Sequence, residues 1–298
     1  MKKNKLILLI DGENILHQSF HKFEKLKSTE GKPSGAIFGF FKSLHMYLTR
    51  WDPDDVIVTF DNGRSSLRME LNPTYKEHRK NIAIDYSSLQ EQKAIILKML
   101  AMLRIKYIFD KNNMNDYEGD DYLAYLVFKY REKNRVMIIS SDKDFNQLIN
   151  KNLKIYNPRK DEIVNQHNCR DLFGYSPEET IDYLSMVGDT SDDIKGIPGI
   201  GPVKARKILD EWGTLNNYLE HHHQTSFVQI AERNNKLINL KWFTENVKLY
   251  KLPIKDYKSS TMIKYEKFRN KAIEYSMSSF LTKQFIEPFS ELNKKRIS

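Results

Sequence analysis

The chain is poor in cysteine and contains no long apolar segment. Cys169 is the one cysteine among its 298 residues, which excludes internal disulfides and fits a reducing compartment. The apolar run at 6–10, behind a basic N-terminus, is far too short for a signal peptide or a membrane span. No long repeat, low-complexity tract or Gly/Ser-rich linker is present. We therefore expect a soluble, cytoplasmic protein without a membrane partner, and we expect it to be a monomer.

The charge balance of the chain is positive. Lys and Arg number 48 against 39 Asp and Glu, which gives a net charge of +9 and a sequence pI near 9.2. This excess favours a polyanionic partner, although it says nothing about the fold. A chain of this length is long enough for a large single domain or for two lobes with a sizeable core.

Three short apolar runs rich in β-branched residues predict strands that are buried on both faces: 6–10, 56–60 and 136–139. Helical patterns lie between them, for example at 37–49 and 120–132. This alternation predicts an α/β fold with a mostly parallel central sheet flanked by helices. A further short strand, expected at an edge of the sheet, is predicted at 153–156. Beyond about residue 176 the pattern is mainly helical and indicates a second lobe.

Each of the three predicted strands leads into aspartate, at Asp11, at Asp61, and at Asp142 with Asp144. In parallel sheets ligands bind at the carboxyl ends of the strands. One aspartate at such a place is usually a turn former or a helix cap. Three equivalent strand ends are harder to attribute to coincidence. They indicate a site at one edge of the sheet.

Two further acidic clusters follow the same pattern. The segment 117–122 opens a helix with Glu118, Asp120 and Asp121, although capping that helix would need only one carboxylate. The segment 188–209 has Asp189, Asp192 and Asp193, then three glycines, then a basic helix that begins at Pro202 and ends before Gly213. Glycines permit close backbone approach, and N–H groups at a helix start attract phosphate oxygens. The alternative is an acidic loop before an ordinary capped helix.

The candidate site collects nine carboxylates, which would repel one another unless cations shared their charge: Asp11, Asp61, Glu118, Asp120, Asp121, Asp142, Asp144, Asp189 and Asp192. Oxygen ligands without histidine or thiolate favour Mg²⁺, with Mn²⁺ as a substitute, and argue against zinc. Two such ions about 4 Å apart suit phosphodiester hydrolysis. An acidic site on a basic body is therefore the pattern expected of a nuclease that acts on DNA.

Six ordered motifs give the chain a resemblance to a known family: L-I-D-G-E-N (9–14), F-D-N-G (60–63), Y-K-E-H-R (75–79), Y-E-G-D-D (117–121), S-D-K-D-F (141–145) and G-D-T-S-D-D-I-K-G-I-P-G-I-G (188–201). The chain resembles the 5′ nuclease family, which includes the 5′–3′ exonuclease domain of bacterial DNA polymerase I, the bacteriophage 5′ exonucleases and the flap endonucleases. The resemblance covers nearly the whole chain and implies a PIN-like core, a helical arch and a helix–hairpin–helix.

The resemblance implies domains and metal ligands. Residues 1–178 would form the catalytic domain with an arch region at about 64–117, and residues 179–298 a helical DNA-binding lobe with the helix–hairpin–helix at about 188–212. One Mg²⁺ would lie among Asp11, Asp61, Glu118 and Asp120, and the other among Asp142, Asp144, Asp189 and Asp192. Asp121 would lie between the two ions, directly or through water.

The resemblance also implies a substrate and its contacts. DNA with a 5′ end or a 5′ flap is the expected substrate, with an RNA primer–DNA hybrid as a further one, in replication or repair. Lys76 and Arg79 would steer the scissile phosphate, Tyr75 would stack on a base, and residues 80–103 would form the arch. The hairpin is expected to bind a potassium ion through its backbone carbonyls. The remaining expected DNA contacts are Lys80, Gly196, Gly199, Gly201, Lys204, Arg206 and Lys207.

Three residues depart from the family pattern. Gln18 stands where polymerase-type members carry Arg, Asp193 where Asn is usual, and Gly119 where Ala is usual. Two alternatives to a structure-specific 5′ nuclease are a PIN-type ribonuclease and a non-catalytic protein that binds DNA junctions. The glycine-rich turn argues against the first, and the complete set of carboxylates argues against the second.

Overall fold

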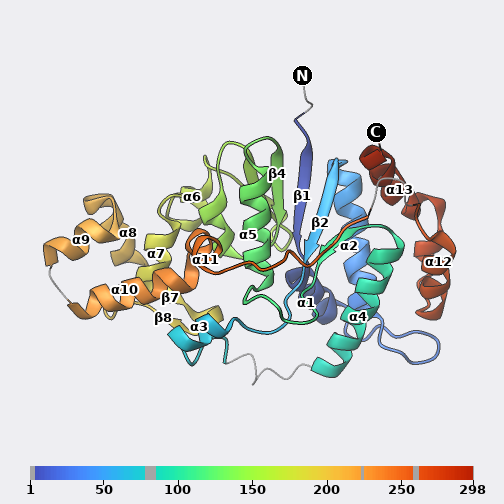
Figure 1. Ribbon diagram of the computed structural model, residues 1–298, viewed down its shortest axis with the longest axis horizontal. Helices are drawn as coiled ribbons and strands as arrows, with labels where there is room; N and C mark the ends of the chain where they lie inside the picture. Colours follow the sequence, from blue (N-terminus) through green and yellow to red (C-terminus); the bar gives the residue numbers. More distant parts are fainter. Residues whose placement is uncertain (1–3, 78–84, 223–224, 258–261, 298) are drawn as a thin grey trace.

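The computed structural model describes residues 4–77, 85–222, 225–257 and 262–297. In these residues a sheet of seven strands crosses the molecule in the order β6-β5-β4-β1-β2-β3-β9 (Figure 1). The parallel strands are β1 (Leu6–Asp11), β2 (Asp55–Thr59), β3 (Lys106–Ile108), β4 (Arg135–Ile139) and β5 (Leu153–Asn157). The antiparallel edge strands are β6 (Glu162–Val164) and β9 (Ile254–Lys255). The predicted mostly parallel central sheet is confirmed.

The edges of the sheet differ from the prediction. The strand expected at an edge, 153–156, is β5, and it is covered by β6 through the pair Ile155–Val164. On the other side β3 pairs with β9, which comes from far along the chain. Strands β3, β6 and β9 have only two or three residues each. Such short segments carry no readable apolar period, so the sequence did not reveal them.

The sheet is buried on both faces, as its apolar runs predict. Leu8 and Ile10 of β1 enter one core, whereas Ile7 and Leu9 enter the other. The first core lies under α1 (Gly12–Lys22), α2 (Gly35–Trp51) and α4 (Tyr86–Met102). The second lies under α5 (Gly119–Tyr130) and α11 (Leu240–Asn246). Alternate residues of one strand therefore hold the two helical layers together.

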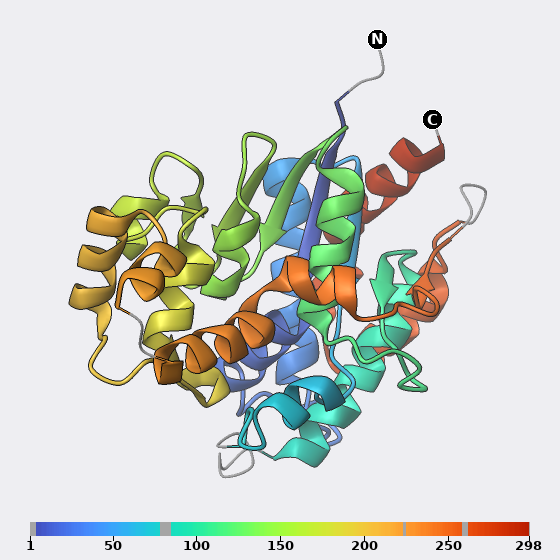
Figure 2. The ribbon, with the colours of Figure 1, turned by 60° about the vertical axis from the view of Figure 1, so that its left-hand side comes forward.

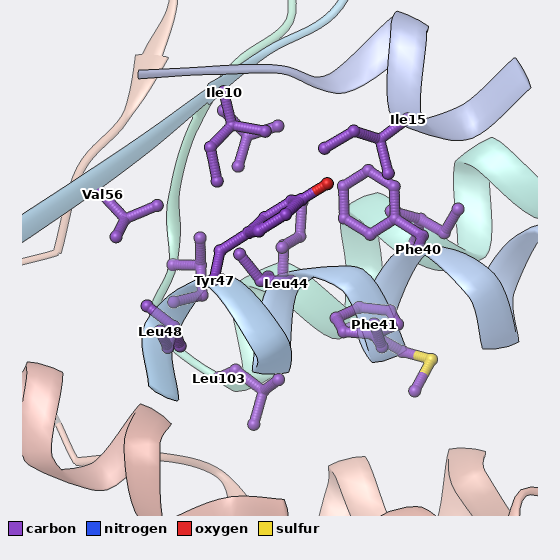
Figure 3. Close-up of a cluster of buried hydrophobic side chains, with 14 of the residues drawn as sticks. Ile10, Ile15, Phe40, Phe41, Leu44, Tyr47, Leu48, Val56 and Leu103 are labelled. Atoms are coloured by element: carbon purple, nitrogen blue, oxygen red, sulfur yellow. The ribbon is translucent and has the colours of Figure 1, made fainter. Parts of the chain in front are cut away.

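The first core is built from large side chains of α2. Figure 3 shows Tyr47, Phe40 and Phe41 on this helix, among Ile10 and Val56 of the sheet. Tyr47 and Phe40 are each 1% exposed and Phe41 is completely buried. Burial of one side chain of this size contributes about 1.5–3 kcal/mol to folding. This core fixes the strands whose carboxyl ends carry the acidic residues.

A separate apolar core holds the second lobe, on the left in Figures 1 and 2. Its main helices are α7 (Thr180–Val187), α8 (Pro202–Trp212), α9 (Leu215–His222) and α10 (Thr225–Ile238). The predicted helix 202–212 ends at Gly213, whose φ of +75° is the conformation that glycine adopts easily. The smaller elements of the chain are α3 (Ser66–Leu71), η2 (Lys143–Leu148), α6 (Cys169–Phe173), β7 (Gly188–Asp189), η3 (Thr190–Asp192), β8 (Ile194–Lys195) and η4 (Ser278–Leu281).

The lobe expected over 179–298 is shorter than predicted. Beyond α10, the chain returns to the α/β domain, where α11 packs on α5 and β9 extends the sheet. Helices α12 (Tyr265–Glu274) and α13 (Lys283–Ile297) then cover α4 and α2. Phe268 and Phe289 are completely buried in the first core. These apolar contacts, which local sequence patterns do not show, pack the C-terminal part of the chain against the α/β domain.

The arch predicted over 80–103 also needs correction. Helix α4 occupies 86–102 and packs in the first core through Leu89, Ile96 and Met99, which are completely buried. It is thus the crossover helix between β2 and β3. Arg79 and Lys80 lie outside the described residues. Within the described ranges, none of the helices combines the length and apolar character needed to cross a bilayer.

Candidate active site

The parallel register brings the acidic strand ends together. Asp11 is paired with Thr59 of β2, and its neighbour Ile10 with Ile139 of β4. The segments that follow β2 and β4 carry Asp61 and Asp142, so these side chains emerge at the same edge as Asp11. The loop of the second lobe that carries Asp189 reaches this edge too, because Lys143 Nζ lies 3.3 Å from Asp189 Oδ1.

Asp11 and Asp142 share one hydroxyl group. Ser140 Oγ donates to Asp11 Oδ2 at 2.7 Å and accepts from the backbone N–H of Asp142 at 3.0 Å. Asp11 also caps α1, because its Oδ1 accepts from Asn14 N at 2.9 Å. Burial raises the pKa of Asp11 to about 7, and the charges of Asp142 and Asp61 add to the shift although the hydrogen bonds oppose it. The buried carboxylates therefore lie close enough to repel one another.

Asp61 lies against the start of α5. Its Oδ1 accepts from Gly119 N at 2.5 Å, and a Cβ atom at position 119 would lie only 2.6 Å from that oxygen. Burial, followed by the charge of Glu13, raises the pKa of Asp61 to about 6. Asp120 follows Gly119, and its pKa is raised well above the usual range, first by burial and then by the charges of Asp11 and Asp142. Gly119, which stands where Ala is usual in the family, thus leaves room for the Asp61 carboxylate.

Asp144 is a poorly satisfied carboxylate of the site. Its Oδ1 atom is buried and has no hydrogen-bond partner among the described residues. Burial and then the charges of Asp142 and Asp189 raise its pKa well above the usual range. Asp189 is better satisfied, because its Oδ1 accepts from the backbone N–H and the hydroxyl of Ser191 at 2.8 and 2.7 Å. An unpartnered buried oxygen of this kind is costly unless a cation compensates it.

Tyr75 and Lys76 connect Glu118 with Asp192. Tyr75 Oη donates to Glu118 at 2.9 Å and lies 3.3 Å from Asp192, and Lys76 Nζ donates to Glu118 at 2.7 Å. Burial alone would raise the pKa of Glu118, but Lys76 and Arg68 outweigh it and lower the pKa to about 2. Tyr75 is 2% exposed and its hydroxyl reaches the carboxylates, so its stacking on a base stays a prediction. Lys76 is also buried, within reach of the site rather than of solvent.

Asp121 forms an ion pair, which corrects its predicted place between two ions. Both of its oxygens accept from Arg68 at 2.7 Å, and the carboxylate is completely buried. Arg68 Nε also donates to the Leu237 carbonyl, and the guanidinium lies 4.0 Å from the Phe243 ring. Asp121 thus holds Arg68, which joins α3, α5, α10 and α11. The sequence pattern did not single out Arg68, because nothing local indicates its burial.

The remaining carboxylates converge without forming a closed cage. In the part of the chain that the structure describes, no three His, Cys, Asp or Glu side chains make a ready set of metal ligands. Their mutual repulsion nevertheless links Asp11, Asp61, Asp120, Asp142, Asp144, Asp189 and Asp192. Glu118 joins this set through Asp61. The eight side chains come from five separate stretches of sequence and meet at one edge of the sheet.

The glycine-rich hairpin lies beside this edge. Gly188 and Gly199 have φ of +80° and +76°, and a Cβ at Gly196 would lie 2.4 Å from the Met186 carbonyl. Ile197 and Ile200 anchor the hairpin in the core of the second lobe. The hairpin ends at Gly201, the N-cap of α8. From α8 the side chains of Lys204, Arg206 and Lys207 are exposed.

Comparison with known proteins covers both parts of the molecule. Residues 6–174 match the family model described as the 5′–3′ exonuclease N-terminal resolvase-like domain, and residues 175–272 match the 5′–3′ exonuclease C-terminal SAM fold. The chain is 32% identical over 218 residues to a 5′–3′ exonuclease of Aquifex aeolicus, which covers 73% of each chain. It is 33% identical over 216 residues to the thermostable DNA polymerase I of Thermus aquaticus, covering 72% of this chain and 25% of the polymerase.

The chain belongs to the 5′–3′ exonuclease family. It is therefore a nuclease, as the six motifs indicated. The fold agrees with solved structures: the T5 D15 protein aligns with a TM-score of 0.66 and 19% identity, over 97% of this chain and 100% of that one. Human GEN1 aligns with a TM-score of 0.54 and 14% identity, over 97% of this chain and 71% of that one.

Two departures from the family pattern of this exonuclease have clear places in the structure. Gln18 Nε2 lies 3.3 Å from Ser141 Oγ and also contacts Asn14, at the rim of the acidic site. Asp193 has a φ of +56°, a conformation that Asp and Asn tolerate better than most residues, and its carbonyl accepts from Asn72 at 3.1 Å. The Asp193 backbone thus fits the turn as Asn would.

Proposed function

We propose that this exonuclease hydrolyses phosphodiester bonds at 5′ ends and 5′ flaps of DNA with two divalent ions. The observation that carries the proposal is the convergence of buried and half-buried, mutually repelling carboxylates beside a hairpin that leads into the basic helix α8. Related structures support it: the T5 D15 protein was co-crystallised with metal ions, and a variant of the T5 D15 flap endonuclease was solved as a pseudo-enzyme–product complex with DNA and metal ions.

The donor atoms suit hard cations. All are carboxylate oxygens, so Mg²⁺ is the expected ion and Mn²⁺ its substitute. The unpartnered Asp144 oxygen and the raised pKa values of Asp11 and Asp120 mark places where positive charge is missing. We assign one ion to Asp11, Asp61, Glu118 and Asp120, and the other to Asp142, Asp144, Asp189 and Asp192. Asp121 is left out because Arg68 holds both of its oxygens.

Bound ions of this kind stabilise negative charge on a phosphate and lower the pKa of water. Lys76 complements them. Although burial opposes it, the charge of Glu118 raises the pKa of Lys76 well above its usual range, so this ammonium stays protonated. Its Nζ lies 2.7 Å from Glu118 and 3.8 Å from Asp192, at the meeting point of the two ligand groups. From there it is placed to bind an oxygen of the scissile phosphate.

The DNA duplex is held elsewhere, at the hairpin and α8. The N–H groups at the start of α8 and the exposed Lys204 suit phosphate oxygens. Lys207 lies 3.6 Å from Glu211 in an exposed pair that solvent weakens, so it remains available to a phosphate. Potassium bound by hairpin carbonyls belongs to the same proposal, as do an RNA primer–DNA hybrid substrate, a role in replication or repair, and a monomeric state.

Cleavage of a labelled 5′-flap duplex tests this function directly. Purified protein should cut the flap with Mg²⁺ or Mn²⁺ and should stop when EDTA is added. A second duplex with its 5′ end blocked separates cutting that starts from a free end from internal cutting. A well-folded preparation that binds the flap duplex but does not cut it with either ion would favour a non-catalytic junction-binding protein instead.

A further inference from the structure

Lys93 carries a positive charge into the interior, next to the acidic site. It lies on α4, and its side chain is 5% exposed. Its Nζ donates to Glu13 Oε2 at 2.7 Å and to the backbone carbonyl of Asp61 at 2.6 Å. The rings of Phe60 and Phe109 lie 5.7 and 5.3 Å from the same nitrogen. The ammonium is thus enclosed by a carboxylate, a carbonyl and two aromatic rings.

These contacts join the elements from which Asp11 and Asp61 emerge. Glu13 is in the first turn of α1, directly after Asp11 and Gly12. The α1 start is packed tightly on the end of β2, since a Cβ at Gly12 would lie 2.6 Å from the Thr59 carbonyl. Lys93 adds a link from α4 to both segments. It therefore holds the Asp61 backbone while the Asp61 side chain reaches Gly119 N.

Glu13 makes Lys93 necessary. Its carboxylate adds a further negative charge beside Asp61, and the Lys93 ammonium offsets that charge, because its Nζ contacts both Glu13 Oε2 and the Asp61 carbonyl. A buried charge is costly unless it is paired, so Glu13 without Lys93 would repel the Asp61 carboxylate. His17 also lies 3.7 Å from Glu13, but its side chain is one-third exposed, so Lys93 is the enclosed partner of the two.

We propose that Lys93 and Glu13 form a buried ion pair that positions Asp61 for divalent-ion binding and thereby for nuclease activity. The inference deepens the proposed function and rests on it, because it takes Asp61 as a metal ligand. Lys93 and Glu13 are positioning residues, since they act through Asp61. The competing explanation is that the pair only stabilises the packing of α1 against α4.

Three variants separate these explanations. Lys93→Met leaves Glu13, whose side chain is 19% exposed, without its ammonium partner. Glu13→Gln combined with Lys93→Met removes both charges, so this protein should fold even where the single variant folds poorly. Lys106→Met is the matched control, because Lys106 makes a partly buried ion pair with Asp55 at 2.8 Å, at the opposite end of β2.

The readouts are thermal unfolding in EDTA, Mn²⁺ binding without DNA followed by electron paramagnetic resonance, and kcat and KM on a 5′-flap duplex. Lys93→Met should unfold at lower temperature and bind Mn²⁺ about 10- to 100-fold more weakly, as expected when a group that orients a metal ligand is lost. Its kcat should fall with KM nearly unchanged. The double variant should regain thermal stability but not Mn²⁺ affinity, because the contact to the Asp61 carbonyl is still missing. Lys106→Met should lose only thermal stability.

Wild-type Mn²⁺ affinity and kcat in Lys93→Met would overturn the positioning role, and so would full recovery of both in the double variant. Failure of the proposed function gives a different result. In that case the wild-type protein would neither bind Mn²⁺ at this site nor cut the flap, whereas the unfolding temperatures of the variants would still report the ion pair.

Discussion

The acidic edge of the sheet and the hairpin of the second lobe use charge in opposite ways. At the sheet edge the carboxylates are buried or half-buried and repel one another, and Asp144 keeps an oxygen without a partner among the described residues. At the hairpin the buried residues are apolar, such as Ile197 and Ile200, and the charges of α8 face solvent. The first arrangement weakens the fold but attracts cations. The second costs the fold little and attracts a polyanion. Catalysis and DNA binding should therefore respond to different substitutions.

The largest expected effect is loss of turnover at the acidic edge. Asp144→Ala removes the carboxylate that has an unpartnered oxygen. Single-turnover cleavage should fall by more than about 100-fold, because loss of a metal ligand should exceed the roughly 10- to 100-fold loss expected for a residue that only orients one. Duplex affinity, measured by fluorescence anisotropy with Ca²⁺, should stay within a few-fold of wild type. Equal losses of binding and cutting would contradict the separation of the two regions.

A substitution in the hairpin core should have the reverse pattern. Ile200→Ala leaves a cavity under the hairpin and should destabilise the second lobe by about 2–5 kcal/mol. Duplex affinity should fall, whereas cleavage at saturating DNA should stay close to wild type. Urea unfolding and anisotropy measure the two effects, and Val203→Ala, at an exposed position of α8, is the control. A fall in saturated turnover as large as the fall in affinity would show that the regions are coupled.

The pH dependence of stability should distinguish the acidic edge when metal is absent. A carboxyl group whose folded-state pKa is raised stabilises the fold at low pH and loses that contribution as the pH rises through the folded value. For Asp11 this window runs from its usual 3.8 to about 7. The pKa of Glu118 is lowered from 4.5 to about 2, so Glu118 does not contribute to the pH dependence of stability above pH 5.

Thermal unfolding in EDTA should therefore show a loss of roughly 1–3 kcal/mol between pH 5.5 and 8. Asp11→Asn should flatten this dependence and raise the unfolding temperature at pH 8. Added Mg²⁺ should stabilise the wild type at pH 8 far more than the variant. A wild-type stability that rises with pH over this range would mean that the pKa of the Asp11 carboxyl is not raised as described.

The smallest expected effect concerns exposed charges. Replacing Lys204 and Lys207 by Gln should leave folding unchanged, because surface pairs such as Lys207–Glu211 contribute little to stability. The slope of log affinity against log salt should fall by about one for each phosphate contact removed. Lys236→Gln, on α10, serves as a surface control. An unchanged slope in the Lys204 and Lys207 variant would argue against duplex binding at α8.

Local sequence determined the strands that lead into the acidic residues, the helix from Pro202 to Trp212 and the residue types of the acidic site. These features depend on apolar runs, capping residues and turn glycines, which act over a few neighbouring positions. The family motifs also predicted that the protein is a nuclease.

Tertiary structure alone decided which charges are paired. Asp121 pairs with Arg68 and Glu13 with Lys93, and the Tyr75 hydroxyl donates to Glu118. It also decided that residues beyond α10 return to the sheet through β9 and Phe268. Partners of this kind lie tens to hundreds of residues apart, and their choice depends on which surfaces bury apolar area together. No local pattern encodes that balance.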